Sequence, residues 1–548
     1  MEKYKKYEIN DIEQTMEDIC FPKEMQRQLL PQQAFLGDYM YDNKNVNGLL
    51  VYHEIGSGKT CTAITIAEKF KNELNIIVVL PASLIYNFRN ELRSECGNNN
   101  YITLKEKEML LQYKPGTKEY NDILQTSDKR IDKVYTIYSY HFFIKQIDRG
   151  LIQLENTLLI IDEVQNMVSI SGTFYKTLLS TINIPVAVSK IILLSATPIF
   201  DNPIEIALTL NLLRPKINFP IGDNFEGVFF EKIGNYWKAR NIPLFKNMCK
   251  GLISYYSGAL PISYPKKNFK VIRCNMNTEQ LATYTITRKK ELVNQKKFKG
   301  SMKFPMNFLL GSRIVSNIAF PNKLAGEEGF SSLKDGLADI EKFSIKFDTI
   351  YKKILESNGP VFVYSAFLDY GGLRSFASYL DYKGYTNFAN IKQDNKCYAI
   401  YSGDVTIEMR ENIKTYFNMK ENTNGKVIKI LLGSPSTKEG ISLFRVKQVH
   451  IMEPHWNLSR IKQIIGRAVR FCSHKDLPEN ERYVDVYLYL ATHISLKHSI
   501  DEYVWSLAKK KYHLVKEFEM ALKDIAIDCK LFNKINNISN ANKLTCEI

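Results

Sequence analysis

A glycine-containing loop with a lysine and a threonine lies between an apolar run and a helix-like stretch. The loop reads HEIGSGKT at positions 53–60, follows GLLVY, precedes CTAITIAEKF, and has His53 where the strict phosphate-loop pattern begins with glycine. In such a loop, glycines let backbone N–H groups close around phosphate oxygens at a helix N-terminus. We expect Lys59 to reach the β- and γ-phosphates and the Thr60 hydroxyl to ligate Mg²⁺. The predicted nucleotide-binding residues of the loop are Gly56, Ser57, Gly58, Lys59 and Thr60.

A pair of carboxylates directly after an apolar run is the second chemical signal. Residues 158–161 read LLII and are followed by Asp162 and Glu163. A buried parallel strand delivers the residues at its carboxyl end to the ligand-binding edge of the sheet. We expect Asp162 to hold Mg²⁺, directly or through water, and Glu163 to orient and deprotonate an attacking water. An ordinary strand exit carries such pairs too, so this interpretation depends on the phosphate loop.

The elements that must position these residues follow from the apolar pattern. Short apolar runs alternate with helical patterns and predict strands at residues 48–52, 76–80, 134–138, 158–161 and 191–194, and again at 361–364, 428–432, 448–452 and 483–489. Apolar strands of about five residues separated by amphipathic helices indicate parallel sheets covered on both faces. The expected fold class is therefore α/β, with two parallel-sheet lobes, a helical insertion and a C-terminal helical brace.

The same pattern predicts how the chain divides. We expect an N-terminal helical segment at 1–28, a first α/β lobe at 29–215 and a helical, patchily basic insertion at 216–340. A second α/β lobe follows at 341–498, and a long helix with a tail occupies 499–548. In that helix, apolar residues recur at the spacing of one buried face.

Composition and charge restrict the class of protein. The chain has 548 residues, of which 45% are hydrophobic, and it has nine cysteines without a CxxC pair. The hydrophobic fraction excludes a disordered chain. Nine cysteines are too few for a disulfide framework in a chain of this length, and they favour a reducing compartment. No apolar run approaches the ~18 residues of a membrane helix, so we expect no membrane partner. The net charge of +16 favours nucleic acid as partner, with lysine-rich composition drift as the alternative.

Five further segments join the phosphate loop and the carboxylates in a recognisable order: Gln33 in LLPQQ, PASL at 81–84, SATP at 195–198, TKEG at 437–440 and QIIGRAVR at 463–470. The set resembles the motif series of superfamily 2 helicases and translocases over about residues 29–475. The resemblance implies two RecA-like lobes with ATP and Mg²⁺ bound between them. Gln165 stands where that family usually has histidine, which puts the coupling between lobes in doubt.

Within the superfamily, residues 193–215 and 81–92 resemble the chromatin-remodelling ATPases. The segments 251–258, 359–367 and 521–529 resemble the nucleoside triphosphate phosphohydrolase I and early transcription factor group of large DNA viruses. The implied function is a nucleic-acid-dependent ATPase, a DNA translocase acting in viral transcription. The alternatives are a strand-separating RNA or DNA helicase and a transcription-factor subunit that mainly binds promoter or polymerase. The implied location is the virion and the host cytoplasm.

The resemblance also implies roles for single residues. Gln33 would read the adenine edge, since an amide can both donate and accept a hydrogen bond. Ser195 and Thr197 would link ATP occupancy to lobe closure. The residues that would reach the γ-phosphate from the second lobe are Gln463, Arg467 and Arg470. The alternative for the two arginines is a salt-bridged helix face, because residues three apart are neighbours on a helix.

Nucleic acid would lie across both lobes and be held by its backbone phosphates, which position a strand without reading its sequence. The expected contact residues are Pro81, Ser83, Ser139, Thr437 and Gly440. DNA is favoured over RNA as the bound polymer. The protein partners that the resemblance implies are an RNA polymerase and a second transcription-factor subunit.

Overall fold

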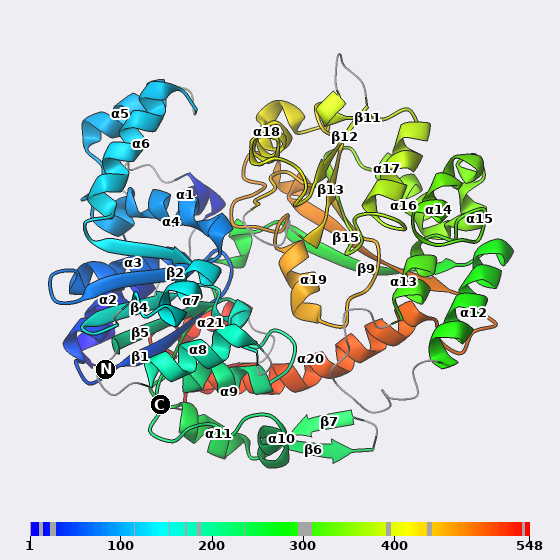
Figure 1. Ribbon diagram of the computed structural model, residues 1–548. Coiled ribbons are helices and arrows are strands. Elements are labelled where there is room, and N and C mark those ends of the chain that lie inside the picture. The colour runs from blue at the N-terminus through cyan, green and yellow to red at the C-terminus, as the bar shows by residue number, and fades with distance from the viewer. Residues whose placement is uncertain are drawn as a thin grey trace. The chain divides into compact units, whose positions relative to one another are not determined.

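The computed structural model of the chain falls into two compact units, each built around one parallel β-sheet (Figure 1). Unit 1 comprises Met1–Ser263 and Lys511–Ile548, and unit 2 comprises Tyr264–Lys510. The structure describes residues 2–547 except for residues 10–14, 22–28, 114–115, 153, 170–171, 184–187, 235, 294–308, 391–395, 436–440 and 540–542. Among the helices it describes, none has the length and apolar character needed to cross a bilayer.

Helices and strands alternate through most of unit 1. Up to its last strand they are α1 (Met16–Cys20), α2 (Pro31–Asp42), β1 (Gly48–His53), α3 (Lys59–Phe70), β2 (Asn75–Leu80), α4 (Ile85–Leu92), α5 (Leu104–Gln112), α6 (Lys118–Ile131), β3 (Tyr135–Ser139), α7 (Tyr140–Asp148), β4 (Thr157–Ile161), α8 (Thr173–Ile182), β5 (Val188–Ser195), α9 (Ile204–Asn211), α10 (Asp223–Phe229), β6 (Phe230–Ile233), β7 (Tyr236–Ala239), α11 (Ile242–Cys249) and β8 (Ile253–Tyr256). The chain returns to unit 1 within α20 (Ile500–Asp524) and ends after α21 (Asn533–Ser539).

The sheet of unit 1 has the strand order β3-β2-β4-β5-β1-β8, and every neighbouring pair is parallel. Side chains that alternate along these strands pack against α2, α3 and α4 in one continuous hydrophobic core. In a parallel sheet all carboxyl ends meet at one edge. The loop after β1, the carboxylates after β4 and Ser195 at the end of β5 therefore share that edge.

Unit 2 repeats the alternation of helices and strands. Its elements are β9 (Lys266–Asn275), α12 (Thr278–Val293), α13 (Leu310–Asn317), α14 (Gly326–Ser331), α15 (Ile340–Phe343), α16 (Ile345–Leu355), β10 (Val361–Tyr364), α17 (Leu373–Tyr382), β11 (Thr386–Asn387), β12 (Cys397–Tyr401), α18 (Ile407–Asn418), β13 (Ile430–Gly433), β14 (Gln448–Ile451), α19 (Leu458–Ile465), β15 (Tyr483–Thr492) and the first part of α20. The parallel sheet has the order β11-β12-β13-β10-β14-β15-β9, with one hydrophobic core on each face. The two parallel sheets expected from the sequence are thus confirmed.

The segment 216–340 differs from the helical insertion that its composition predicts. It contains β6, β7, β8 and β9, and the border between the units falls inside it, at Ser263. Strand β8 joins the sheet of unit 1, and β9 joins the sheet of unit 2 as an edge strand. β9 is difficult to recognise in the sequence because its side chains are mostly polar and exposed, as edge strands commonly are.

Two disulfide bonds lie in unit 1, Cys61–Cys96 and Cys529–Cys546, separated by 35 and 17 residues in the sequence. Such bonds are not expected in the reducing compartment that the cysteine count favours. The spacing of these cysteines has no signature of pairing, and only the folded chain brings them together. Cys61 lies in the first turn of α3, directly after the phosphate loop.

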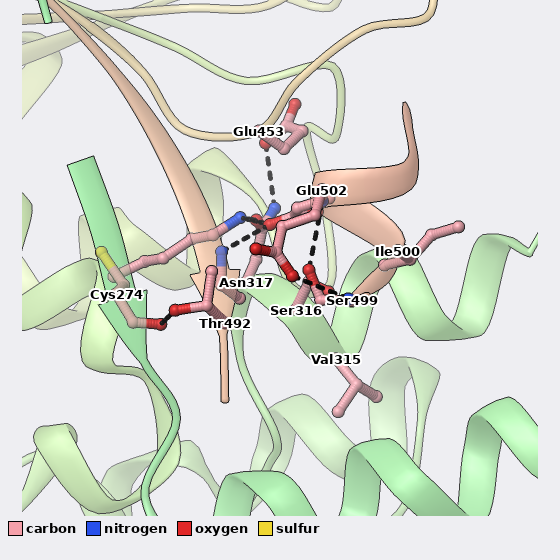
Figure 2. A network of polar contacts seen from close by, with 12 residues as sticks. Cys274, Val315, Ser316, Asn317, Glu453, Thr492, Ser499, Ile500 and Glu502 are labelled. Atoms are coloured by element: carbon pink, nitrogen blue, oxygen red, sulfur yellow. Dashed lines mark hydrogen bonds and ion pairs between the residues drawn. The ribbon is translucent and has the colours of Figure 1, made fainter. Parts of the chain in front are cut away.

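A buried ion pair fixes the start of α20 in unit 2. Lys346 Nζ lies 2.6 Å from Asp501 Oδ2, and the side chains are 0% and 2% exposed. Lys346 also donates to Asn317 Oδ1, whose amide nitrogen donates to Glu453 Oε2 at 3.0 Å. The backbone N–H of Ala491, on β15, donates to the same Asp501 oxygen. Figure 2 shows Asn317 and Glu453 facing one another beside the start of α20.

We predict that Asp501→Asn destabilises unit 2 by about 3–5 kcal/mol, because it leaves the Lys346 ammonium buried without a counter-charge. The measurement is the urea midpoint of unfolding. Asp339→Asn is the matched control, since its pair with Lys342 is more than half exposed, and it should change stability by less than about 1 kcal/mol. Equal midpoints for the two variants would contradict the role given to this pair.

Candidate active site

The loop between β1 and α3 has the backbone that a phosphate loop requires. Gly56 and Gly58 have φ values of 86° and 74°, in the left-handed region where glycine carries no steric penalty. A Cβ atom on Gly58 would lie 2.4 Å from Gln33 Nε2, so a larger residue would have to displace the Gln33 amide and adopt a strained backbone. α3 starts at Lys59 and Thr60 immediately after the loop, which places a helix N-terminus at its end.

His53 accounts for the one departure of the loop from the strict pattern. It is the last residue of β1 and pairs with Tyr256 of β8, so no turn glycine is needed there. Its imidazole is fully buried, and Nε2 lies 3.0 Å from Ser254 Oγ. Burial lowers the pKa of His53 to about 3, with the Lys59 charge acting in the same direction, so the ring is neutral.

Side chains at the start of α2 hold the second half of the loop. The Gln32 amide donates to the Ser57 carbonyl at 3.1 Å, and the Gln33 amide donates to the Gly58 carbonyl at 3.3 Å. Gln33 Oε1 also accepts the backbone N–H of Leu30, which caps the helix. Gln33 therefore lies against the loop. Gln32 does so too, although it is not among the residues that the sequence motifs predict for the site.

A buried hydroxyl in the loop fits a phosphate ligand. Ser57 is 1% exposed, and within the part of the chain that the structure describes its Oγ has no hydrogen-bond partner. A buried polar group without a partner costs free energy, and a phosphate oxygen would satisfy this one. Lys59 at the end of the loop forms an ion pair with Glu163, with its Nζ 3.0 Å from Glu163 Oε1.

The two carboxylates follow β4 as the sequence predicts. Asp162 is 5% exposed, and its Oδ1 accepts the backbone N–H of Glu163 at 2.9 Å. Burial raises the pKa of Asp162 to about 6; the Lys59 charge opposes this rise, and the Glu163 charge adds to it. Glu163 has a φ of 49°, which turns its side chain away from the strand direction and onto Lys59. The Tyr140 hydroxyl donates to the carbonyls of both residues.

Gln165 connects the carboxylate pair to the end of β5. Its amide nitrogen donates to Glu163 Oε2 at 2.5 Å, and the Ser195 hydroxyl donates to Gln165 Oε1 at 2.7 Å. Ser195 Oγ accepts the backbone N–H of Thr197 at 3.0 Å. The substitution that puts coupling in doubt at the sequence level thus supplies a continuous hydrogen-bond chain, because an amide can donate at one end and accept at the other.

The predicted nucleic-acid contacts of unit 1 lie at the same edge of the sheet. β2 ends one residue before Pro81, and Ser83 is exposed in the short turn that follows. Ser139 ends β3 and pairs with Leu80 at the end of β2. The other two predicted contacts, Thr437 and Gly440, lie outside the described residues.

Unit 2 carries the remaining predicted site residues. Gln463 lies in α19, whereas Arg467 and Arg470 come after the helix ends at Ile465. They therefore lie in the turn that follows α19, outside the helix itself. The Arg467 carbonyl accepts the Leu443 N–H at 2.9 Å, and burial lowers the pKa of Arg470.

A parallel sheet with a phosphate loop after one strand and a carboxylate pair after another is the architecture of a nucleoside triphosphate hydrolase. Residues 32–322 match the SNF2-related domain, and residues 345–472 match the helicase conserved C-terminal domain. Because the first match spans more than half of the chain, the chain belongs to the SNF2-related family.

Individual relatives are viral. A protein of Acanthamoeba polyphaga mimivirus with the provisional name of ATP-dependent RNA helicase is 45% identical over 555 residues, covering 100% of this chain and 96% of that protein. A termination factor NPH-I homolog of African swine fever virus is 26% identical over 568 residues, covering 89% of this chain and 77% of that protein. Among solved structures, a Sulfolobus solfataricus SWI2/SNF2 ATPase core in complex with dsDNA has 17% identity and a TM-score of 0.33, covering 91% of this chain and 98% of that one.

The family and its relatives establish the general activity. The chain is a nucleic-acid-dependent ATPase of the superfamily 2 helicase type and uses ATP as its substrate. This confirms the function class that the sequence motifs imply.

We predict that Gln165→Leu lowers ATP turnover by about ten- to a hundredfold with little change in the KM for ATP, because it breaks the chain from Glu163 to Ser195 without touching the phosphate loop. Steady-state ATPase kinetics measure both constants. Gln125→Leu, at an exposed position on α6, is the control and should behave as wild type. A loss confined to KM would place Gln165 in substrate binding instead.

Proposed function

We propose that this ATPase is a DNA translocase that acts in viral transcription. The observation that carries its ATPase part is the hydrogen-bonded path from Lys59 through Glu163 and Gln165 to Ser195, which links the expected ATP-site residues of unit 1. The likeness to a viral termination factor homolog and to the SNF2-related family supports DNA and transcription. The net charge of +16 supports a polyanionic partner.

In this proposal each residue of the phosphate loop has one task. Backbone N–H groups of the segment 56–60 surround the phosphates, the Ser57 hydroxyl donates to a phosphate oxygen, and Lys59 moves from Glu163 to the β- and γ-phosphates. Gln33 contacts the adenine edge. The Thr60 hydroxyl and the Asp162 carboxylate, both oxygen ligands at the same sheet edge, would hold Mg²⁺, whose bound charge neutralises that of the phosphates.

The remaining tasks are those of chemistry and coupling. Glu163, released from Lys59, orients the attacking water and accepts its proton. Arg467 and Arg470 would stabilise charge on the γ-phosphate when the lobes close on ATP, with Gln463 beside them. Ser195 and Thr197 would report the state of this site to the rest of the chain. These assignments rest on the family resemblance together with the geometry of unit 1.

The proposal places DNA at the carboxyl ends of β2 and β3, where Ser83 is exposed, Ser139 is half-buried and Pro81 is buried, and against Thr437 and Gly440 of the second lobe. Its biological setting is the virion and the host cytoplasm, with an RNA polymerase or a second transcription-factor subunit as protein partner. A strand-separating RNA helicase is the second candidate, since the mimivirus relative carries that name. A subunit that mainly binds promoter or polymerase is not favoured by the helicase-type family match.

The decisive experiment compares ATP turnover with single-stranded DNA, duplex DNA and RNA of equal length. We expect duplex DNA to raise turnover several-fold and RNA to raise it less. Binding should be independent of sequence, and log K should fall against log salt with a slope of about −0.9 for each phosphate neutralised on duplex DNA. Stronger stimulation by RNA would favour the helicase candidate, and a flat salt response would assign the lysines to composition drift.

We predict that Lys59→Ala and Glu163→Gln both abolish ATP hydrolysis, but by different routes. The first removes the charge that holds the phosphates, so ATP affinity itself should fall. The second leaves the phosphate loop intact and removes only the proton acceptor, so ATP should still bind. ATP titration followed by calorimetry and a turnover assay separate the two outcomes. Turnover near the wild-type rate in Glu163→Gln would refute the role given to Glu163.

A further inference from the structure

The C-terminal segment of the chain lies along β8, the edge strand of the sheet in unit 1. The Ile527 backbone N–H donates to the Ile253 carbonyl at 2.8 Å, and the Tyr255 N–H donates to Asp528 Oδ1 at 2.9 Å. β8 in turn pairs with β1, the strand that leads into the phosphate loop. Residues near the end of the sequence are thereby one strand away from the loop.

A buried hydrogen-bond chain joins this segment to the first loop position. The Ser254 hydroxyl donates to Asp528 Oδ2 at 2.5 Å, and His53 Nε2 lies 3.0 Å from the same hydroxyl oxygen. Since Ser254 has one proton and gives it to Asp528, His53 must donate through Nε2. All three side chains are 0% exposed. The orientation of the His53 ring thus depends on Asp528.

A second contact reaches the next residue of the loop. Lys523 Nζ, at the end of α20, lies 3.0 Å from Glu54 Oε1, and the Tyr255 hydroxyl donates to the same oxygen at 2.8 Å. The Lys523 ammonium also lies 4.5 Å from the centre of the Tyr255 ring. The Lys523 side chain is 8% exposed and the Glu54 side chain 39% exposed, so water screens this ion pair mainly from the Glu54 side.

The segment is itself firmly held. Cys529 is bonded to Cys546, and the Ser257 N–H donates to Asn536 Oδ1 at 2.8 Å. The Phe532 ring lies edge-on to Tyr256 at 5.4 Å and to Phe35 of α2 at 6.0 Å. In Figure 1 the red end of α20 and α21 lie with the strands of unit 1. A segment fixed in this way can determine the position of what it contacts.

We propose that Lys523 and Asp528 are positioning residues for ATP hydrolysis, which hold the first half of the phosphate loop through Glu54 and His53. This rests on the phosphate-binding role proposed for the loop. Gln32 and Gln33 donate to the carbonyls of Ser57 and Gly58, in the second half of the loop. The C-terminal segment reaches the first half, where His53 stands in place of the usual turn glycine and Glu54 follows it.

If the contacts of the C-terminal segment served only to stabilise the fold, substitutions there would have different effects. They would lower the stability of unit 1 against unfolding and leave the kinetics of the folded enzyme unchanged. A positioning residue changes ATP affinity and turnover in the folded enzyme, because a small displacement of the loop moves the N–H groups and Lys59 away from the phosphates.

The experiment uses the full-length chain and measures basal ATPase without nucleic acid, together with binding of a non-hydrolysable ATP analogue with Mg²⁺. We expect Lys523→Gln and Asp528→Asn each to lower kcat/KM for ATP by about tenfold. The matched control is Lys246→Gln, which removes the ion pairs of Lys246 with Asp524 and Glu547 of the same C-terminal segment. It should lower thermal stability with less than about a twofold kinetic effect.

A double-mutant cycle provides the second test, which stands even if Asp528→Asn does not fold. The effects of Glu54→Gln and Lys523→Gln on kcat/KM should be non-additive, because both changes break one contact. Additive effects, or kinetics equal to those of Lys246→Gln, would overturn the proposal. Basal activity and analogue binding need no nucleic acid. If DNA failed to stimulate the wild type, the proposed function would be refuted, but the effects of the variants on basal kinetics would still test the positioning role.

Discussion

The turn between β1 and α3 depends on side chains that come from distant parts of the chain. Two of its residues have positive φ, so the turn has little conformational preference of its own, and glycine makes the unfolded loop costly to order. Amides from α2 hold its far end and the C-terminal segment holds its near end. The order of strands in the sheet, with β8 beside β1, is what makes the second of these supports available.

Electrostatics accounts for the other side of the site. Two adjacent carboxylates, one of them buried, repel each other, and Lys59 is the cation that balances them in the absence of nucleotide. Glu163 also accepts a hydrogen bond from Gln165 through its other carboxylate oxygen, so Lys59 is not its sole partner. Under the role proposed for Glu163, the same lysine would both balance the resting charge and leave Glu163 to act as a base when it moves to the phosphates.

The sequence was sufficient where the signal was local. Lys59, Asp162 and Glu163 stand beside buried apolar strands, and the structure brings them together as that pattern predicts. The strands β8 and β9 were not foreseen, because the first is short and the second is polar along an edge. The contact between Ser254 and Asp528 joins residues 274 positions apart, and the sequence around either residue does not predict it.

The helix α20 connects the two units without a break in its hydrogen-bonded backbone. The chain passes from unit 2 to unit 1 between Lys510 and Lys511, in the interior of this 25-residue helix. A helix keeps a fixed rise of about 1.5 Å per residue, so it resists stretching and carries load along its axis. One end is anchored by Asp501 on buried Lys346, and along the other lie Lys511, paired with Asp201 after the SATP segment, and Lys523 on the phosphate loop. The chain therefore passes between the units through a hydrogen-bonded helix, which could lengthen at that point only if its backbone hydrogen bonds broke.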